Sequence, residues 1–167
     1  HPKFEEFFKK NSICPDVLVI ACGYLEIEEK NFNKIISTNY LSPLIFIEKF
    51  INFYENQKKN YSIIGISSVA GDRGKKKNSI YSSSKSAFSS YLDGLRQRLY
   101  PKKINVMTVK PGWIGTKMIK NHKIPKFMIT NVDIIGEKIF KGFSNKKNIL
   151  YVPSYWRIIM FVYKLVP

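Results

Sequence analysis

Residues 61–85 read YSIIGISSVAGDRGKKKNSIYSSSK. The apolar run predicts a buried strand over Tyr61–Ile66, and a polar loop follows it over Ser67–Ile80. A helix over Ser82–Leu99 then leads the chain back along the sheet. A strand, a loop and a helix in this order form one unit of an α/β fold with a parallel sheet.

The rest of the chain alternates in the same way. The predicted strands cover Val17–Ala21, Ile104–Val109 and Ile149–Val152, and the predicted helices cover Phe4–Lys10, Phe32–Asn56 and Val132–Phe143. The run Val17–Ala21 is apolar throughout, which is typical of a parallel strand covered on both faces. In the long helix, Pro43 predicts a kink after Asn39. We therefore predict an α/β, Rossmann-like doubly wound parallel sheet, with ligand sites at the carboxyl ends of its strands.

Two side chains four residues apart, Tyr81 and Lys85, give this fold a chemical site. Residues i and i+4 share one face of a helix, so the ammonium of Lys85 should lie beside the phenol of Tyr81. A neighbouring positive charge favours the phenolate, and we therefore expect Lys85 to lower the pKa of Tyr81 from its ordinary value of about 10. Ser68, at the end of the preceding strand, should point into the same cleft and donate to a carbonyl oxygen.

Together, Ser68, Tyr81 and Lys85 resemble the catalytic set of the short-chain dehydrogenase/reductase family. In that family the tyrosine is the general acid–base, the serine orients the carbonyl, and the lysine lowers the tyrosine's pKa and binds the nicotinamide ribose. The resemblance implies a fourth catalytic residue, Asn39 in the stretch STNY, which would hold the helix geometry and a water that relays protons. It also implies the cofactor NAD(P), with NADP slightly favoured over NAD.

The family's P-G-x-x-x-T segment, on the nicotinamide side, matches PGWIGT at residues 111–116. By this resemblance the cofactor would contact Gly23, Tyr81, Lys85, Pro111, Gly112, Ile114 and Thr116. The sequence departs from the family at residues 20–23, which read IACG where most members have N-N-A-G. This departure removes the usual asparagine contacts there and leaves the catalytic residues untouched.

A narrower resemblance covers SSVAGDRG at 67–74, TVKPG at 108–112 and YVPSYWRIIM at 151–160. These stretches look like reductases of polyprenylphosphoryl ketoribose, which complete the synthesis of the cell-wall sugar donor decaprenylphosphoryl arabinose. The resemblance implies reduction of a ketone, a keto-sugar on a polyprenyl phosphate, to an alcohol by hydride transfer, with Tyr81 as the general acid. The alternative from another class is a non-catalytic basic membrane-surface or binding module with vestigial motifs.

The first 60 residues lack the glycine-rich turn that holds a dinucleotide's pyrophosphate, since their only glycine is Gly23. The chain begins at His1, within what reads as the helix before the family's fourth strand. We therefore expect residues 1–153 to be a partial short-chain dehydrogenase domain whose first βαβαβ half is absent, and this portion to be inactive alone. The strand Val17–Ala21 would then be an exposed apolar sheet edge.

The net charge of +16 suggests nucleic-acid binding, but the lysines fall in separate loops without a nucleic-acid motif. We interpret the charge as a solvated surface, with attraction to an anionic membrane or phosphorylated lipid as the alternative, and expect no nucleic-acid partner. With 44% hydrophobic residues the chain should form one core. We expect no metal site and no disulfide at Cys14 and Cys22, and no ligand role for His122.

Residues 154–167 are an apolar segment whose charges are Arg157 and Lys164. The segment is shorter than the roughly 20 residues that span a bilayer. A membrane-interfacial helix and a helix packed over the cleft or at a subunit contact both fit it, and a lipid-linked substrate favours the first. We expect a cytoplasmic protein at the inner face of the membrane, which forms homo-oligomers when full length and binds a small-molecule or lipid-linked sugar substrate.

Overall fold

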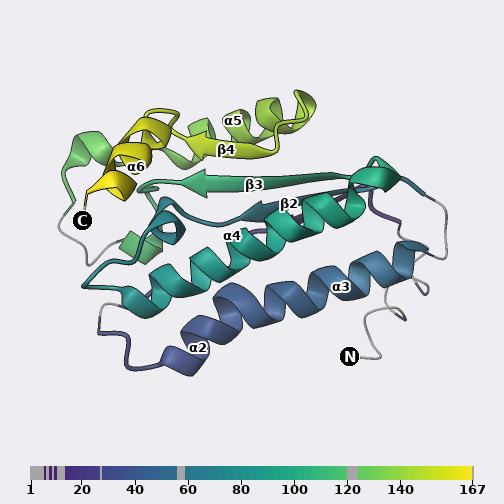
Figure 1. Ribbon diagram of the computed structural model, residues 1–167, viewed down its shortest axis with the longest axis horizontal. Helices are drawn as coiled ribbons and strands as arrows, with labels where there is room; N and C mark the ends of the chain where they lie inside the picture. The colour runs from purple at the N-terminus through teal and green to yellow at the C-terminus, as the bar shows by residue number, and fades with distance from the viewer. Residues whose placement is uncertain are drawn as a thin grey trace.

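The computed structural model describes residues 6, 8, 10, 14–26, 28–55, 59–119 and 124–166. In this part of the chain a parallel sheet of four strands lies between two helical layers (Figure 1). The strands are adjacent in chain order and are β1 (Val17–Ile20), β2 (Ser62–Ile66), β3 (Asn105–Pro111) and β4 (Ile149–Val152). This architecture confirms the predicted α/β fold with a parallel sheet.

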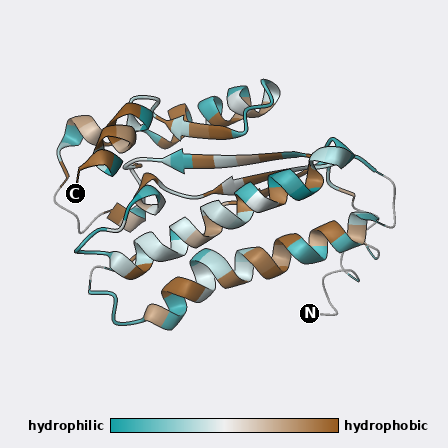
Figure 2. Cartoon of the chain, viewed as in Figure 1, coloured by the Kyte–Doolittle hydropathy of each residue, from teal (hydrophilic) through white to brown (hydrophobic). Residues whose placement is uncertain are grey.

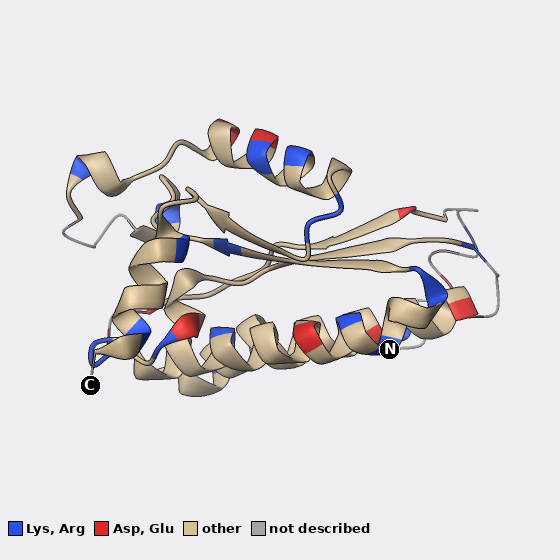
Figure 3. Cartoon of the chain, turned by 45° about the horizontal axis from the view of Figure 1, so that its top comes forward, with Lys and Arg blue, Asp and Glu red and all other residues tan. Residues whose placement is uncertain are grey.

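The two faces of the sheet are covered by different helices. Helices α3 (Ser42–Glu55) and α4 (Ser79–Leu99) lie on one face, and α5 (Val132–Ser144) lies on the other (Figure 3). Ile63 belongs to the core cluster under α3 and α4, whereas Ile64 belongs to the cluster under α5. Successive strand residues point to opposite faces, so one continuous apolar run fills both layers.

Several helix boundaries in the structure differ from the predicted ones. Helix α4 begins at Ser79, three residues earlier than predicted, so Tyr81 lies in its first turn. The predicted polar loop contains a 3₁₀ helix, η2 (Val69–Asp72). Of the helix predicted over Phe4–Lys10 the structure describes only residues 6, 8 and 10, and His122 lies outside the described residues.

The prediction that the first strand is covered on both faces is wrong. Val19 on β1 is 51% exposed. The reason is that α5 packs on β4, at the opposite edge of the sheet, and does not reach over β1. Within the described residues β1 pairs with β2 alone.

The predicted long helix is present as α2 (Phe32–Ile36), a π-helical segment η1 (Ser37–Leu41) and α3. The irregular turn therefore surrounds Asn39 and does not follow it. Pro43 has no N–H to donate to the carbonyl of Asn39 four residues earlier, and the wider π turn accommodates this missing bond. The turn leaves the side chain of Asn39 fully buried.

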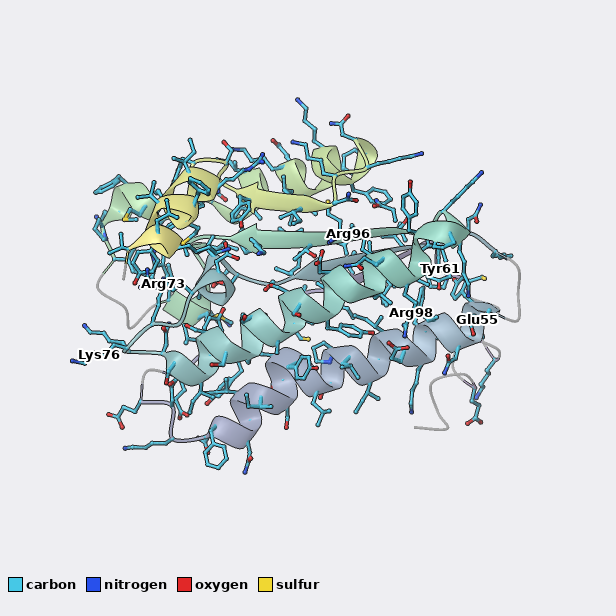
Figure 4. All side chains as sticks on the ribbon, viewed as in Figure 1. Glu55, Tyr61, Arg73, Lys76, Arg96 and Arg98 are labelled. Carbon is cyan, nitrogen blue, oxygen red and sulfur yellow. The ribbon has the colours of Figure 1, made fainter. Side chains whose placement is uncertain are left out.

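Helix α6 (Trp156–Leu165) lies across the carboxyl end of the sheet and is largely apolar (Figure 2). The indole of Trp156 packs on Gly112 so closely that a Cβ there would lie 1.9 Å from Nε1. At the other end of the helix, the Arg73 guanidinium donates to the carbonyls of Tyr163 and Val166 (Figure 4). In the described part of the chain, no helix is both long and apolar enough to cross a membrane.

Two arginines of α4 fasten this helix to both of its neighbours (Figure 4). Arg98 pairs with both carboxylate oxygens of Glu48 on α3, at 2.8 and 2.9 Å. Arg96 reaches the sheet, where it donates to the Val106 carbonyl at 2.9 Å and to the Thr108 hydroxyl at 2.8 Å. Because Arg96 is mostly buried, these bonds fix the height of α4 above β3.

The contact between η2 and α4 gives a first prediction. A Cβ on Gly71 would lie 2.7 Å from the Lys85 carbonyl carbon and 2.9 Å from the Ser86 nitrogen, which are helix backbone atoms that cannot rotate away. Gly71→Ala should therefore lower the free energy of unfolding by about 1–3 kcal/mol, measured by chemical denaturation. Gly74→Ala, at a position with no atom within 4 Å, should change it by less than about 0.5 kcal/mol. Equal stability of the two variants would contradict this packing.

Candidate active site

A cavity of about 190 Å³ opens at the carboxyl ends of β1, β2 and β3, where a sheet of this type binds its ligands. Eight of the predicted site residues line it: Gly23, Ser68, Tyr81, Lys85, Pro111, Gly112, Ile114 and Thr116. Asn39 is the remaining predicted residue and lies behind the wall, fully buried. The fold thus brings together residues that are up to 93 positions apart in the sequence (23 to 116).

Ser68 lies two residues after the end of β2 and is the N-cap of the 3₁₀ helix η2. Its Oγ accepts a hydrogen bond from the N–H of Ala70 at 3.1 Å. A hydroxyl that accepts through its oxygen still has its own O–H to donate. Ser68 therefore presents a hydrogen-bond donor to the cavity.

Tyr81 lies in the first turn of α4, with its ring buried and its edge on the cavity. Burial raises the pKa of the Tyr81 phenol, and the neighbouring Ser68 hydroxyl opposes this effect only in part. The expected lowering of this pKa by Lys85 is wrong for this structure, because burial disfavours the phenolate and the Lys85 ammonium is not one of the groups that act on the phenol.

Lys85 is 3% exposed, and its ammonium donates to main-chain carbonyls instead of the phenol. Nζ lies 3.1 Å from the carbonyl oxygen of Ile66 and 3.4 Å from that of Cys22. Burial lowers the pKa of Lys85 to about 8. An ammonium has three donors, so one N–H remains after these two bonds for a ligand in the cavity.

Asn39 joins three segments behind the cavity wall. Its Oδ1 accepts from the N–H of Tyr24 at 2.7 Å, and its Nδ2 donates to the Tyr24 carbonyl at 2.8 Å. Nδ2 also donates to the hydroxyl of Ser84 at 3.1 Å, and this hydroxyl donates to the Tyr81 carbonyl at 2.7 Å. The amide thereby holds the loop after β1 against the helix that carries Tyr81.

Glu29 is a site-supporting residue that sequence reasoning missed. Its carboxylate accepts from the N–H groups of Ile80 and Tyr81, at 3.0 and 2.7 Å, at the start of α4. A carboxylate at a helix amino terminus satisfies amides that lack a partner within the helix. No local pattern reveals this cap, because Glu29 lies 52 residues before Tyr81.

The arrangement fits the nicotinamide end of NAD(P). A Cβ on Gly23 would lie in van der Waals contact with Lys85 Nζ, at 3.5 Å, so the main chain at this glycine runs close to the ammonium. Pro111, Gly112, Ile114 and Thr116 form the facing wall. Among the described residues, no three His, Cys, Asp or Glu side chains lie close enough together to hold a metal ion.

The cap on α4 gives a second prediction. Glu29→Ala removes the acceptor for two amides of the first turn, and we expect the free energy of unfolding to fall by about 0.5–2 kcal/mol. Glu28→Ala is the matched control, because Glu28 is exposed and pairs with Lys30 on the surface. Chemical denaturation of both variants measures the difference. A Glu29 variant as stable as the Glu28 variant would show that the cap has no energetic role.

The buried ammonium gives a third prediction. Because the pKa of Lys85 falls from 10.5 to about 8 on folding, the unfolded chain binds more protons than the folded protein between these pH values. Stability contributed by this residue therefore rises with pH across that window. From pH 7.5 to 9.5, wild type should gain about 2 kcal/mol in unfolding free energy relative to Lys85→Met. Parallel pH profiles of the two proteins would contradict the lowered pKa.

Sequence comparison identifies the relatives of this chain. The model of the short chain dehydrogenase family matches residues 14–125. An uncharacterized oxidoreductase of Myxococcus xanthus is 30% identical over 112 residues, which are 65% of this chain and 44% of that protein. The human 3-oxoacyl-[acyl-carrier-protein] reductase is 34% identical over 67 residues, 40% of this chain and 28% of the reductase. The chain thus spans less than half of the length of these relatives.

Solved structures share the fold at low sequence identity. A short chain dehydrogenase from Burkholderia cenocepacia in complex with NADP superposes with a TM-score of 0.82 and 18% identity, covering 96% of this chain and 70% of that one. A 4-hydroxyisoleucine dehydrogenase complexed with NADH and succinate gives 0.73 and 19%, with coverages of 90% and 72%. With the family match over two thirds of the sequence, these findings show that the chain belongs to the short-chain dehydrogenase family.

Proposed function

We propose that the protein reduces a ketone to an alcohol with NAD(P)H. The observation that supports this most is that the Ser68 hydroxyl, the Tyr81 phenol and the Lys85 ammonium line one cavity. A donor for the carbonyl oxygen, a proton source and a cation are the three groups that such a reduction requires from the protein. The described residues supply all three at the carboxyl edge of the sheet.

In the proposed mechanism the ketone oxygen accepts the O–H of Ser68 and faces the Tyr81 phenol. When bound, the nicotinamide supplies the hydride. The Tyr81 phenol donates its proton to the ketone oxygen as negative charge develops there, which is the role of a general acid. Lys85 holds the cofactor's ribose with its remaining N–H, and Asn39 keeps the loop after β1 in place and supports a proton-relaying water.

We propose a keto-sugar on a polyprenyl phosphate as the substrate. This proposal rests on the resemblance of residues 67–74 and 151–160 to the ketoribose reductases. The apolar side chains of Ile158, Phe161 and Leu165 on α6 are exposed and suit contact with a lipid chain at the inner face of the membrane. NADP is the cofactor we favour slightly over NAD.

We also propose that the full-length protein forms homo-oligomers. The apolar side chains of Leu41 and Ile45, on the helix formed by η1 and α3, are 47% and 45% exposed. Tyr100 at the end of α4 is 79% exposed. These side chains lie on the helical layer that is not covered by other described elements, and association of two copies would bury them.

A spectrophotometric assay of the full-length protein tests the function. Consumption of NADPH or NADH in the presence of a ketone panel, from simple ketones to lipid-linked keto-sugars, would support it and rank the two cofactors. The alternative, a non-catalytic basic membrane-surface module, predicts no turnover with any ketone. It also predicts vesicle binding that falls steeply with salt, because exposed charges are screened.

The role of Tyr81 gives a fourth prediction. Tyr81→Phe removes the proton donor and keeps the buried ring, so ketone reduction by the full-length protein should fall by about 10²–10⁴-fold. Cofactor affinity should stay nearly unchanged. Tyr100→Phe removes a hydroxyl from an exposed ring and should leave the rate unchanged. Retention of more than about a tenth of the activity in Tyr81→Phe would rule out the general-acid role.

A further inference from the structure

One cation of the cavity wall is not used by the proposed mechanism. Lys75 lies on the loop between η2 and α4, seven residues after Ser68 and six before Tyr81. It is half-buried and lines the same cavity as these two residues. Its neighbours in the sequence differ, because Lys76 and Lys77 are exposed, and Figure 4 shows Lys76 projecting away from the molecule.

Lys75 has no carboxylate partner within the described part of the chain. The nearest acid in the sequence, Asp72, is already engaged, because it pairs with Lys110 and accepts from the Tyr151 hydroxyl at 2.7 Å. The contact that Lys75 does make is with the ring of Trp113, whose centroid lies 5.9 Å from Nζ. Burial lowers the pKa of Lys75, as expected for a desolvated ammonium without an anion.

The wall around Lys75 is otherwise mainly apolar. The apolar side chains that line the cavity include Leu25, Val69, Ala70, Trp113, Met118 and Ile119. In such surroundings water screens a charge poorly, so an unpaired cation is costly and its attraction to an anion is strong. A negatively charged group of a ligand would pair with the Lys75 ammonium and offset the free-energy cost of its desolvation.

We propose that Lys75 binds an anionic group, a phosphate or a carboxylate, of the ketone substrate. The ketone itself rests on the proposed function, whereas anion binding by Lys75 does not depend on turnover. Lys75 lines the same cavity as Ser68 and Tyr81, which would hold the ketone oxygen, and we therefore assign the anion to the substrate. Gly23, on the loop after β1, and Lys85, on α4, line the part of the cavity that we assign to the nicotinamide.

Calorimetry on the full-length protein tests the inference with three unreactive probes: hexyl phosphate, hexanoate and hexanol. Wild type should bind at least one anion more tightly than hexanol, and the better anion identifies the group as phosphate or carboxylate. Lys75→Met should weaken binding of that anion by about tenfold or more, since hydrogen bonds to charged groups contribute this much. Lys75→Arg should retain the preference, and Lys76→Met should behave as wild type.

Three results would overturn the inference: equal wild-type affinity for the anions and hexanol, an anion affinity that Lys75→Met leaves intact, or a matching loss of NADPH affinity in that variant. The last would assign Lys75 to the cofactor. Should Lys75→Met fail to fold, Lys75→Gln carries the same expectations. A wild type that binds hexyl phosphate through Lys75 but reduces no ketone would refute the proposed function alone.

Discussion

The close approach of the segment after β2 to the backbone of α4 is the constraint on which the site depends. Gly71 touches the main chain of Lys85, with no room for a Cβ, and the Ser67 hydroxyl donates to the Lys85 carbonyl at 3.0 Å. These contacts fix the end of a strand against one turn of a helix. Because Ser68 belongs to the first element and Tyr81 to the second, the same packing sets their relative position and opens the cavity at the junction.

Buried polar side chains hold the loops around this junction in place through hydrogen bonds to the main chain. Lys85 donates to carbonyls of the loop after β1 and of β2, and Asn39 pairs with both main-chain groups of Tyr24. A buried amide or ammonium is tolerated only when such partners are present. The cost of burying a charge at Lys85 is therefore offset by bonds that also order the cavity wall. The site and the stability of its loops rest on one network.

Local sequence patterns predicted the strands and the residues of the cavity, but they did not predict contacts that depend on tertiary packing. Apolar runs gave the strands, and the serine, tyrosine and lysine spacing placed three groups at one cavity. The i to i+4 spacing of Tyr81 and Lys85 set the helix face but not the direction of the long lysine side chain, which turns to the carbonyls of the neighbouring strand ends. Glu29 could not be found at all, because it caps α4 from 52 residues away.

Asp72 and Lys75 are three residues apart, yet the carboxylate is paired and the ammonium is not paired with a described carboxylate; the packing of the segment explains this difference. Asp72 is turned inward, where Lys110 at the end of β3 and the Tyr151 hydroxyl of β4 surround its carboxylate, and Lys164 of α6 lies 3.8 Å away. It therefore ties η2 to the sheet and to α6. Since that carboxylate already has these partners, Lys75 lines the cavity without a carboxylate partner among the described residues. The cavity is therefore lined by two lysines in different states: Lys85 is held by main-chain carbonyls, and Lys75 has no carboxylate partner among the described residues.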